Sequence, residues 1–240
     1  MASPLDQFVI KPIIPIHIAG ADFSFTNSAL WMAISVICIY ALVMLGTRHA
    51  ALVPGRLQSV VELGYEFVAS MIRDNAGRDG MKYFPIIFSL FMFILFGNML
   101  GMIPGSFTFT SHIIVTFFMA ACVFVAVTVI GFMKHGLHFF SLFTPPGAPK
   151  AIWPLLVPVE ILSYCVRPIS LSVRLFCNML AGLTMMKVFA TFAVALGIFG
   201  FAPLLIIIAL TGLKLLVAFL QAYIFTVLTC VYLHDSLHLH

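Results

Sequence analysis

Charged side chains are scarce in this sequence. Asp, Glu, Lys and Arg together make up 8% of its 240 residues, whereas a soluble domain usually carries about 25%. Hydrophobic residues make up 62% of the chain, and the mean hydropathy is +1.16. This composition excludes a water-soluble fold. Strands that alternate apolar and polar residues, which a membrane β-barrel needs, are also absent. We therefore expect a single all-α integral membrane domain over residues 1–240.

Several motifs that carry chemistry are missing as well. The chain has no HExxH, no GxSxG, no intramembrane aspartate pair and no phosphate-binding GxxxxGK[ST] sequence. Its five cysteines are isolated in apolar segments without a CxxC pair, which argues against disulfides and zinc. His234, His238 and His240 could bind a metal in vitro, but a solvated terminus is the preferred interpretation. We predict no catalytic site within the chain, no cofactor, no metal and no nucleic-acid partner.

The N-terminal third of the chain divides into three parts. No signal peptide is visible, because Asp6, Lys11 and three prolines interrupt its start, and residues 1–26 are expected to form a non-cytoplasmic segment without a long helix. Residues 27–47 form the first apolar span. Residues 57–75 place apolar and polar side chains on opposite helical faces, which predicts an amphipathic helix on the membrane surface. A span with a polar seam is the alternative.

Residues 83–133 contain two apolar stretches joined by a short link without any charged residue, which predicts a helical hairpin. Basic residues cluster in the loops on both sides of it, namely Arg73, Arg78, Lys82, Lys134 and Lys150. Because basic loops stay in the cytoplasm, the short link and the N-terminus are expected on the periplasmic side. The C-terminus is expected in the cytoplasm.

Residues 151–233 are expected to form two long helices. The first apolar stretch would be roughly 70 Å long as one helix and the second about 46 Å, while the hydrocarbon core is roughly 30 Å thick. The first stretch therefore either contains two ordinary spans broken near Pro168 or forms one bent, strongly tilted helix. The residues alone leave both interpretations open.

Five charged residues lie inside these late apolar segments: Glu160, Arg167, Arg174, Lys187 and Lys214. Each charge at mid-membrane costs about 2.5 to 3.5 kcal/mol on insertion scales, so a charge there usually marks a functional site. Glu160 could lie near the interface and Lys187 could extend toward the headgroups. Arg174 cannot reach the interface or the headgroups in this way, because it is far from both ends of its segment.

The spacing of these residues places them on one helical stripe, formed by Glu160, Ser163, Arg167, Ser170, Arg174 and Asn178. Lys214 and Gln221 repeat the seven-residue spacing on the last helix. A polar track along an apolar helix is typical of an ion path or a polar contact surface. The alternative is that Arg174 binds Asn178, Gln221 and backbone carbonyls only to fix helix packing.

Two motifs resemble the signature of subunit a of F-type ATP synthases. The first is the run from Pro168 to Gly182, in which a turn rich in small residues precedes Arg174-Leu-Phe-Cys-Asn178. The second is the run from Leu220 to Tyr232, which contains Gln221. The likeness covers nearly the whole chain, including Glu160 fourteen residues before the arginine and the Asn98 to Pro104 stretch.

This resemblance implies a fold and a mechanism. In that family two long helices lie nearly flat against a rotating ring of small proteolipid subunits, which favours the tilted interpretation. The family's arginine separates two aqueous half-channels and keeps ring carboxylates ionised. By resemblance Arg174 is this residue, Asn178 and Gln221 accompany it, Glu160 lies toward the cytoplasmic half-channel, and Lys214 and Leu183 line the opposite one.

The remaining expectations follow from the same resemblance. Ser170, Asn98 and His112 join the predicted ion path, although an interfacial histidine is the preferred reading of His112. Leu183 and Gly101 stand where relatives often carry titratable groups. The implied partners are the proteolipid ring, the b subunits of the peripheral stalk, the F1 head of the assembled complex and the lipid bilayer. The implied location is a bacterial inner membrane, with H⁺ as the expected coupling ion.

Two other functions were weighed against the stator of a rotary ATP synthase. A self-sufficient secondary transporter would usually show internal repeats and paired broken helices, and no repeat is found. A membrane enzyme such as an intramembrane protease would need one of the missing motifs. The sequence therefore favours a non-catalytic, ion-translocating stator subunit.

Overall fold

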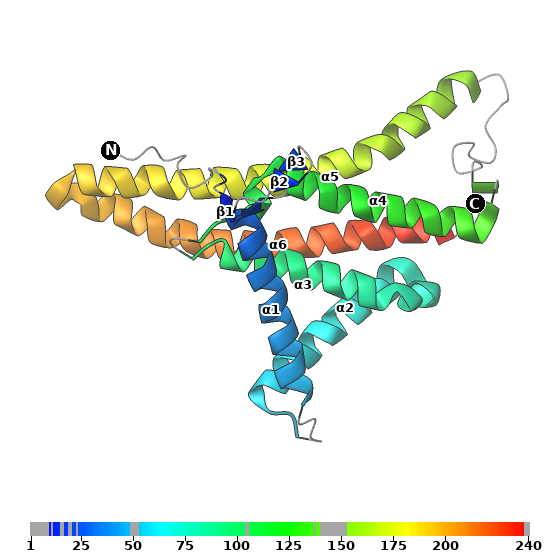
Figure 1. Cartoon of the computed structure of the whole chain (residues 1–240), viewed down its shortest axis with the longest axis horizontal. Coiled ribbons are helices and arrows are strands. Elements are labelled where there is room, and N and C mark those ends of the chain that lie inside the picture. Colours follow the sequence, from blue (N-terminus) through cyan, green and yellow to red (C-terminus); the bar gives the residue numbers. More distant parts are fainter. Residues whose placement is uncertain are drawn as a thin grey trace.

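The protein is an all-α membrane protein in which six α-helices dominate the described residues. The computed structural model describes residues 10, 12–14, 17–18, 21–22, 24–48, 53–103, 106–136, 138–139 and 153–237. Within these ranges, five helical stretches are long and apolar enough to cross a membrane. Figure 1 shows α3, α4, α5 and α6 running along the long axis of the molecule, with α1 lying across them and α2 oblique.

Short strands precede the first helix. β1 (Pro12–Ile14) pairs antiparallel with β4 (Phe25–Thr26), and β2 (His17–Ile18) pairs with β3 (Ala21–Asp22). These strands were not predicted from the sequence, because prolines exclude a helix without excluding short strands at an edge. Apart from Ile10 and Ser24, the rest of the 1–26 segment lies outside the described residues.

Helix α1 (Asn27–Thr47) occupies the range of the first predicted span. Thr26 caps it, because its Oγ1 accepts a hydrogen bond from the backbone N–H of Ala29 at 3.4 Å. Gly46 contacts the following helix, and a Cβ added to it would lie 2.7 Å from Cγ2 of Val61. Gly46 therefore lets the two backbones approach closely.

Helix α2 (Arg56–Gly80) covers the predicted amphipathic helix and continues five residues beyond it. Gly77 interrupts the helix with φ of 70°, a conformation that glycine adopts without a steric cost. The side chains of Val68 and Ile72 are fully buried, whereas Glu62 and Glu66 are exposed. Leu57 and Val60 of the predicted apolar face are exposed as well, so that face is buried only from Val61 onward.

Helices α3 (Phe84–Leu100) and α4 (Ile113–His135) follow the predicted hairpin segment after the short 3-10 turn η2 (Met81–Tyr83). The chain reverses direction between them, through a link that includes the 3-10 turn η3 (Phe109–Ser111). The order of two helices joined by a short reversing link is that of the predicted hairpin. α6 packs against both helices, which the sequence did not predict.

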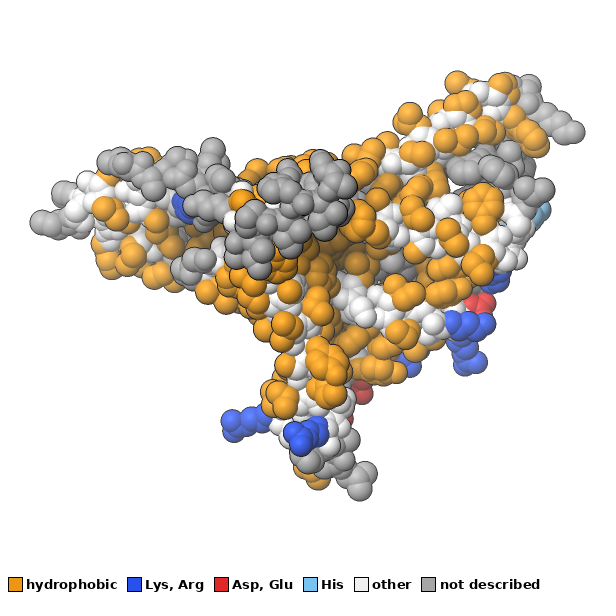
Figure 2. Space-filling model, viewed as in Figure 1, with side chains coloured by type: hydrophobic (Ala, Val, Ile, Leu, Met, Phe, Trp, Pro, Cys, Tyr) orange, Lys and Arg blue, Asp and Glu red, His pale blue; other side chains and the backbone are white. Residues whose placement is uncertain are grey.

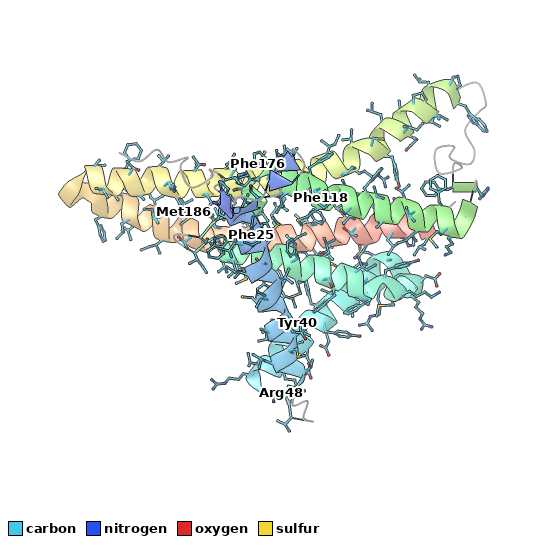
Figure 3. The ribbon with its side chains drawn as sticks, viewed as in Figure 1. Phe25, Tyr40, Arg48, Phe118, Phe176 and Met186 are labelled. Atoms are coloured by element: carbon cyan, nitrogen blue, oxygen red, sulfur yellow. The ribbon has the colours of Figure 1, made fainter. Side chains whose placement is uncertain are left out.

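The separation of α3 and α4 leaves an apolar groove of about 790 Å³ between α1, α3 and α4. Tyr40 and Phe118, both labelled in Figure 3, border this groove from α1 and α4. Within the link between α3 and α4, Phe109 fills the space beside Gly97, where an added Cβ would lie 2.4 Å from the phenylalanine ring. The link is thereby packed directly onto the end of α3.

Helices α5 (Trp153–Ala195) and α6 (Phe201–Leu237) are antiparallel and joined by the 3-10 turn η6 (Gly197–Gly200). α5 is one continuous helix with Pro158 and Pro168 inside it, so the alternative of two spans broken near Pro168 is wrong. Figure 1 shows the start of α5 diverging from α4, as expected where prolines remove backbone hydrogen bonds. α6 ends at Leu237, four residues beyond the predicted limit at Leu233.

The lengths of these two helices constrain their orientation. α5 has 43 residues and α6 has 37, which correspond to about 65 Å and about 56 Å at 1.5 Å per residue. Both are apolar over most of their length, while the hydrocarbon core is about 30 Å thick. Upright helices of this length would project far into water, so a strong tilt is the arrangement that keeps them in lipid.

The surface separates charge from apolar residues. Figure 2 shows apolar side chains over most of the visible face, with most of the visible Lys, Arg, Asp and Glu along its lower and lower right margins. Arg48, at the lower end of α1, is labelled in Figure 3. At the ends of α4 and α6, Lys134 Nζ donates to the Leu237 carbonyl at 3.1 Å and lies 3.9 Å from Asp79. A cation at two helix C-termini also satisfies their free carbonyls.

Candidate functional site

Arg174 lies on the middle part of α5. Phe176, two residues later, is labelled near the centre of the molecule in Figure 3. The Arg174 side chain is exposed in the isolated chain, although its neighbours Leu171, Ser172 and Leu175 are buried. With the residues that the structure describes, Arg174 forms neither a hydrogen bond nor an ion pair. The alternative in which it binds Asn178 and Gln221 to fix packing therefore has no contact to support it.

The backbone beside Arg174 is held by α4. Ser172 and Thr116 are both completely buried, and their hydroxyl oxygens lie 3.1 Å apart. Because either hydroxyl can donate, the pair satisfies itself inside an apolar interface. A hydrogen bond between membrane helices fixes their relative position. Thr116 thus fixes α5 two residues away from the arginine.

Asn178 and Lys214 meet at a second point of the α5–α6 interface. They line a cavity of about 180 Å³. Asn178 Nδ2 and Lys214 Nζ are both buried, and neither has a hydrogen-bond partner in the described part of the chain. Gly182 lies against the lysine stem, where an added Cβ would be 3.0 Å from Cε. Two unpaired donors that line one cavity can both hydrogen-bond to an acceptor placed in it, such as water or a carboxylate.

Asn98 and Gln221 lie close to this cavity in the fold. Asn98 is completely buried, and its Nδ2 donates to the Ala218 carbonyl at 3.4 Å. Ala218 is one turn from Lys214 and nearly one turn from Gln221 on α6. Asn98 Oδ1 has no partner among the described residues, and Gln221 is 9% exposed. The sequence-predicted polar residues of α3, α5 and α6 are thus gathered around one stretch of α6.

Three other predicted residues lie apart from this group. Glu160 is half-buried on α5, fourteen residues before Arg174, which is about 21 Å along the helix axis. Ser170 is exposed, and its Oγ donates to the Arg167 carbonyl at 3.3 Å. His112 immediately precedes α4 and stacks on Phe107 with ring centroids 5.1 Å apart. No hydrogen bond within the described ranges joins any of the three to Arg174.

Arg167 belongs to a separate cluster that sequence reasoning did not find. Its Nη1 donates to Asp235 Oδ2 at 3.0 Å, and its guanidinium lies over the rings of Tyr164 and Tyr232. Tyr164 in turn shares a 2.8 Å hydrogen bond with Thr128 of α4. The sequence did contain a signal for this cluster: Arg167 is a cation within an apolar helix, and such a cation requires a counter-ion. Asp235, on the neighbouring helix, is that counter-ion.

No group of three potential metal ligands occurs in the described ranges. His234 is part of α6, while His238 and His240 lie outside the described residues. The isolated cysteines found in the sequence are all free. The arrangement therefore offers cations, amides and hydroxyls along a helix hairpin, which can attract a carboxylate and hold water.

Comparisons with known proteins find relatives along nearly the whole chain. The family model described as ATP synthase A chain matches residues 29–234. A protein named ATP synthase subunit a from Parvibaculum lavamentivorans is 57% identical over 98% of this chain and 93% of its own length. The protein of that name from Rhodospirillum rubrum is 54% identical over the full length of both chains. That from Mesorhizobium japonicum is 57% identical over 98% of this chain and 96% of its own.

Proposed function

The chain belongs to the ATP synthase A chain family, and from this premise we propose how its residues translocate protons. It is a non-catalytic, multi-span membrane subunit of a bacterial F-type ATP synthase, the proton-translocating stator subunit of the membrane sector. In our proposal, Arg174 faces carboxylates of a rotating proteolipid ring and separates two aqueous half-channels. The observation that carries this role is an exposed arginine on an apolar helix that has no partner in the described part of its own chain.

The attraction within one charge pair is strong enough to make a ring carboxylate release its proton. A guanidinium and a carboxylate about 4 Å apart attract each other by near 4 kcal/mol at an effective dielectric constant of about 20. A ring carboxylate that approaches Arg174 therefore remains ionised and gives up its proton before it passes. Arginine suits this position because it stays protonated even where solvation is poor, whereas a lysine can lose its proton and let ions leak.

The two half-channels reach Arg174 from opposite ends of the α5–α6 hairpin. Glu160, with Ser170 between it and Arg174, lies toward the end where basic loops gather, which we assign to the cytoplasm. Asn178, Lys214, Gln221 and Asn98 line the route on the other side of the arginine. The unpaired buried donors of Asn178 and Lys214 and the unpaired Oδ1 of Asn98 support the presence of water there. His112, in the α3–α4 link, lies at the periplasmic end.

The partners follow from the surface of the hairpin. Large apolar side chains of α5 and α6, among them Val166, Val173, Leu213 and Leu216, are exposed in the isolated chain. We propose that part of this face packs against the ring and the remainder against lipid. The peripheral stalk b subunits and the F1 head complete the assembly. The proposed orientation in the inner membrane places the N-terminus in the periplasm and the C-terminus in the cytoplasm.

The test is replacement of Arg174 by Ala in the complete complex. We expect ATP synthesis from a proton gradient to be abolished, because nothing then keeps the passing carboxylate ionised or blocks a direct path between the half-channels. ATP hydrolysis by the detached head should remain intact. Lys82→Ala, which removes an exposed cation at the expected cytoplasmic surface, is the matched control and should retain synthesis.

The proposal would be wrong if Arg174→Ala membranes still made ATP from a proton gradient. A complex of normal subunit composition must be confirmed for both variants. Loss of synthesis together with a lost ring would indicate a packing role instead.

A further inference from the structure

Two arginines on the same helical stripe have opposite surroundings. Arg167 is half-buried, with 29% of its side chain exposed, and Asp235 holds it through a 3.0 Å ion pair. Its guanidinium also lies 4.9 Å from the centroid of the Tyr232 ring and 5.5 Å from that of Tyr164. Arg174 is exposed and unpaired within the described part of the chain. One cation is therefore neutralised and the other is free.

Arg167 and Arg174 lie near each other along α5. Seven residues separate them, which is about two helical turns and about 10 Å along the axis, on the same face. Arg167 lies on the N-terminal side of Arg174, toward the start of α5. A carboxylate that approaches Arg174 from that end of α5 would also feel Arg167 if Arg167 were not neutralised, since Coulomb attraction decays slowly where screening is weak.

We propose that Asp235 masks Arg167, so that a rotor carboxylate meets a single free cation, Arg174, on this stretch of α5. An unmasked Arg167 would be a second site at which the ring carboxylate stays ionised. The carboxylate would then leave this stretch of α5 and move on toward lipid more slowly. Asp235 acts through Arg167 and is a positioning residue for charge. This inference rests on the proposed function, because it presupposes the passing carboxylate.

The tyrosines make the masking geometry specific. Tyr164 and Tyr232 hold the guanidinium from two helices, and Thr128 of α4 fixes Tyr164 through a 2.8 Å hydrogen bond. The arginine is thus kept at the Asp235 carboxylate and away from the exposed face. A simple ion pair for stability would not need the cation to be removed from that face.

The experiment compares four variants in the assembled complex: Asp235→Asn, Asp235→Glu, Arg167→Gln and the double variant Arg167→Gln/Asp235→Asn. ATP synthesis and ATP-driven proton pumping are measured in inverted membrane vesicles and divided by the amount of assembled complex. Asp235→Asn should lower turnover about tenfold, since it unmasks a cation in a weakly screened site. Asp235→Glu, Arg167→Gln and the double variant should remain within about twofold of wild type, because none leaves a free cation at this position.

The double variant separates masking from a structural clamp. If the ion pair only fixes α5 to α6, Arg167→Gln and the double variant must be as slow as Asp235→Asn, and that result would overturn the inference. Should Asp235→Asn fail to assemble, Arg167→Gln alone still decides, since masking requires it to work and a clamp requires it to fail.

Arg174→Ala is measured in the same membranes to keep the two proposals distinguishable. If Arg174→Ala abolishes synthesis while the double variant stays slow, only the masking role is lost. If Arg174→Ala retains synthesis, the proposed function itself fails.

Discussion

The end of the α5–α6 hairpin near Asp235 and its middle solve the same problem in opposite ways. Near Asp235, the Arg167 guanidinium is satisfied by an ion pair and two aromatic rings, and the Tyr164 hydroxyl is bonded to Thr128. In the middle, Asn178 and Lys214 present unpaired donors to one cavity. A satisfied network stabilises packing, whereas buried donors without acceptors cost free energy. The difference indicates that the middle is built for water or a partner that the isolated chain lacks.

Replacing Lys214 with Met should have the largest effect on proton pumping, and it tests whether the middle of the hairpin holds water. Burying a charge without a partner costs several kcal/mol, so Met should leave the assembled complex equally stable or more stable. Proton pumping should nevertheless fall at least about tenfold, because an apolar cavity stays dry and interrupts the route. The measurement is ATP-driven pumping in vesicles, together with the thermal midpoint of the purified complex.

Lys187→Met is the matched control on the same hairpin. Lys187 lies on α5 beyond the cavity and does not line it, so its replacement should change pumping little. Full pumping by Lys214→Met would show that this route does not need the lysine. A large loss of stability would show that the ammonium has a partner in the complex.

Replacing Tyr164 with Phe should produce a smaller effect at the satisfied end of the hairpin. The change removes the 2.8 Å hydrogen bond to Thr128 but keeps the aromatic face beside Arg167. A net loss of about 1 kcal/mol in stability is expected for one such bond. The thermal midpoint should fall while turnover per complex stays close to wild type. Unchanged stability together with slow turnover would contradict the structural role assigned to this bond.

The elements of the fold were accessible from the sequence because membrane helices carry a strong local signal. Apolar windows located α1 and the two long C-terminal helices, and opposite faces identified α2. The seven-residue spacing also placed Arg167 and Arg174 on one stripe. These predictions depend on residues within a few turns of each other, where composition and periodicity suffice.

The packing between distant helices could not be predicted in this way. Nothing local indicates that α6 lies between α3 and α4, because that position results from the fit of three apolar surfaces. The Arg167–Asp235 pair joins residues 68 positions apart. Ending the last helix at Leu233 left Asp235 outside it, so the counter-ion that Arg167 requires was not recognised. The gathering of Asn98 with the α6 residues likewise became visible only in three dimensions.

His112 offers the smallest expected effect and a third environment outside the membrane-spanning helices. Burial lowers its pKa below the ordinary value of 6.5, its ring stacks on Phe107, and its Nε2 has no partner among the described residues. The unfolded chain therefore binds the proton more readily, so the stability that His112 contributes is present above pH 6.5 and is lost as the pH falls from 6.5 through the lowered pKa of the folded state. His112→Phe should keep the stacking and remove this dependence. Thermal midpoints at pH 8 and pH 6 should differ more for wild type than for the variant.

An equal difference in both proteins would mean that His112 gains a partner in the complex, and would favour its predicted place in the ion path over simple packing.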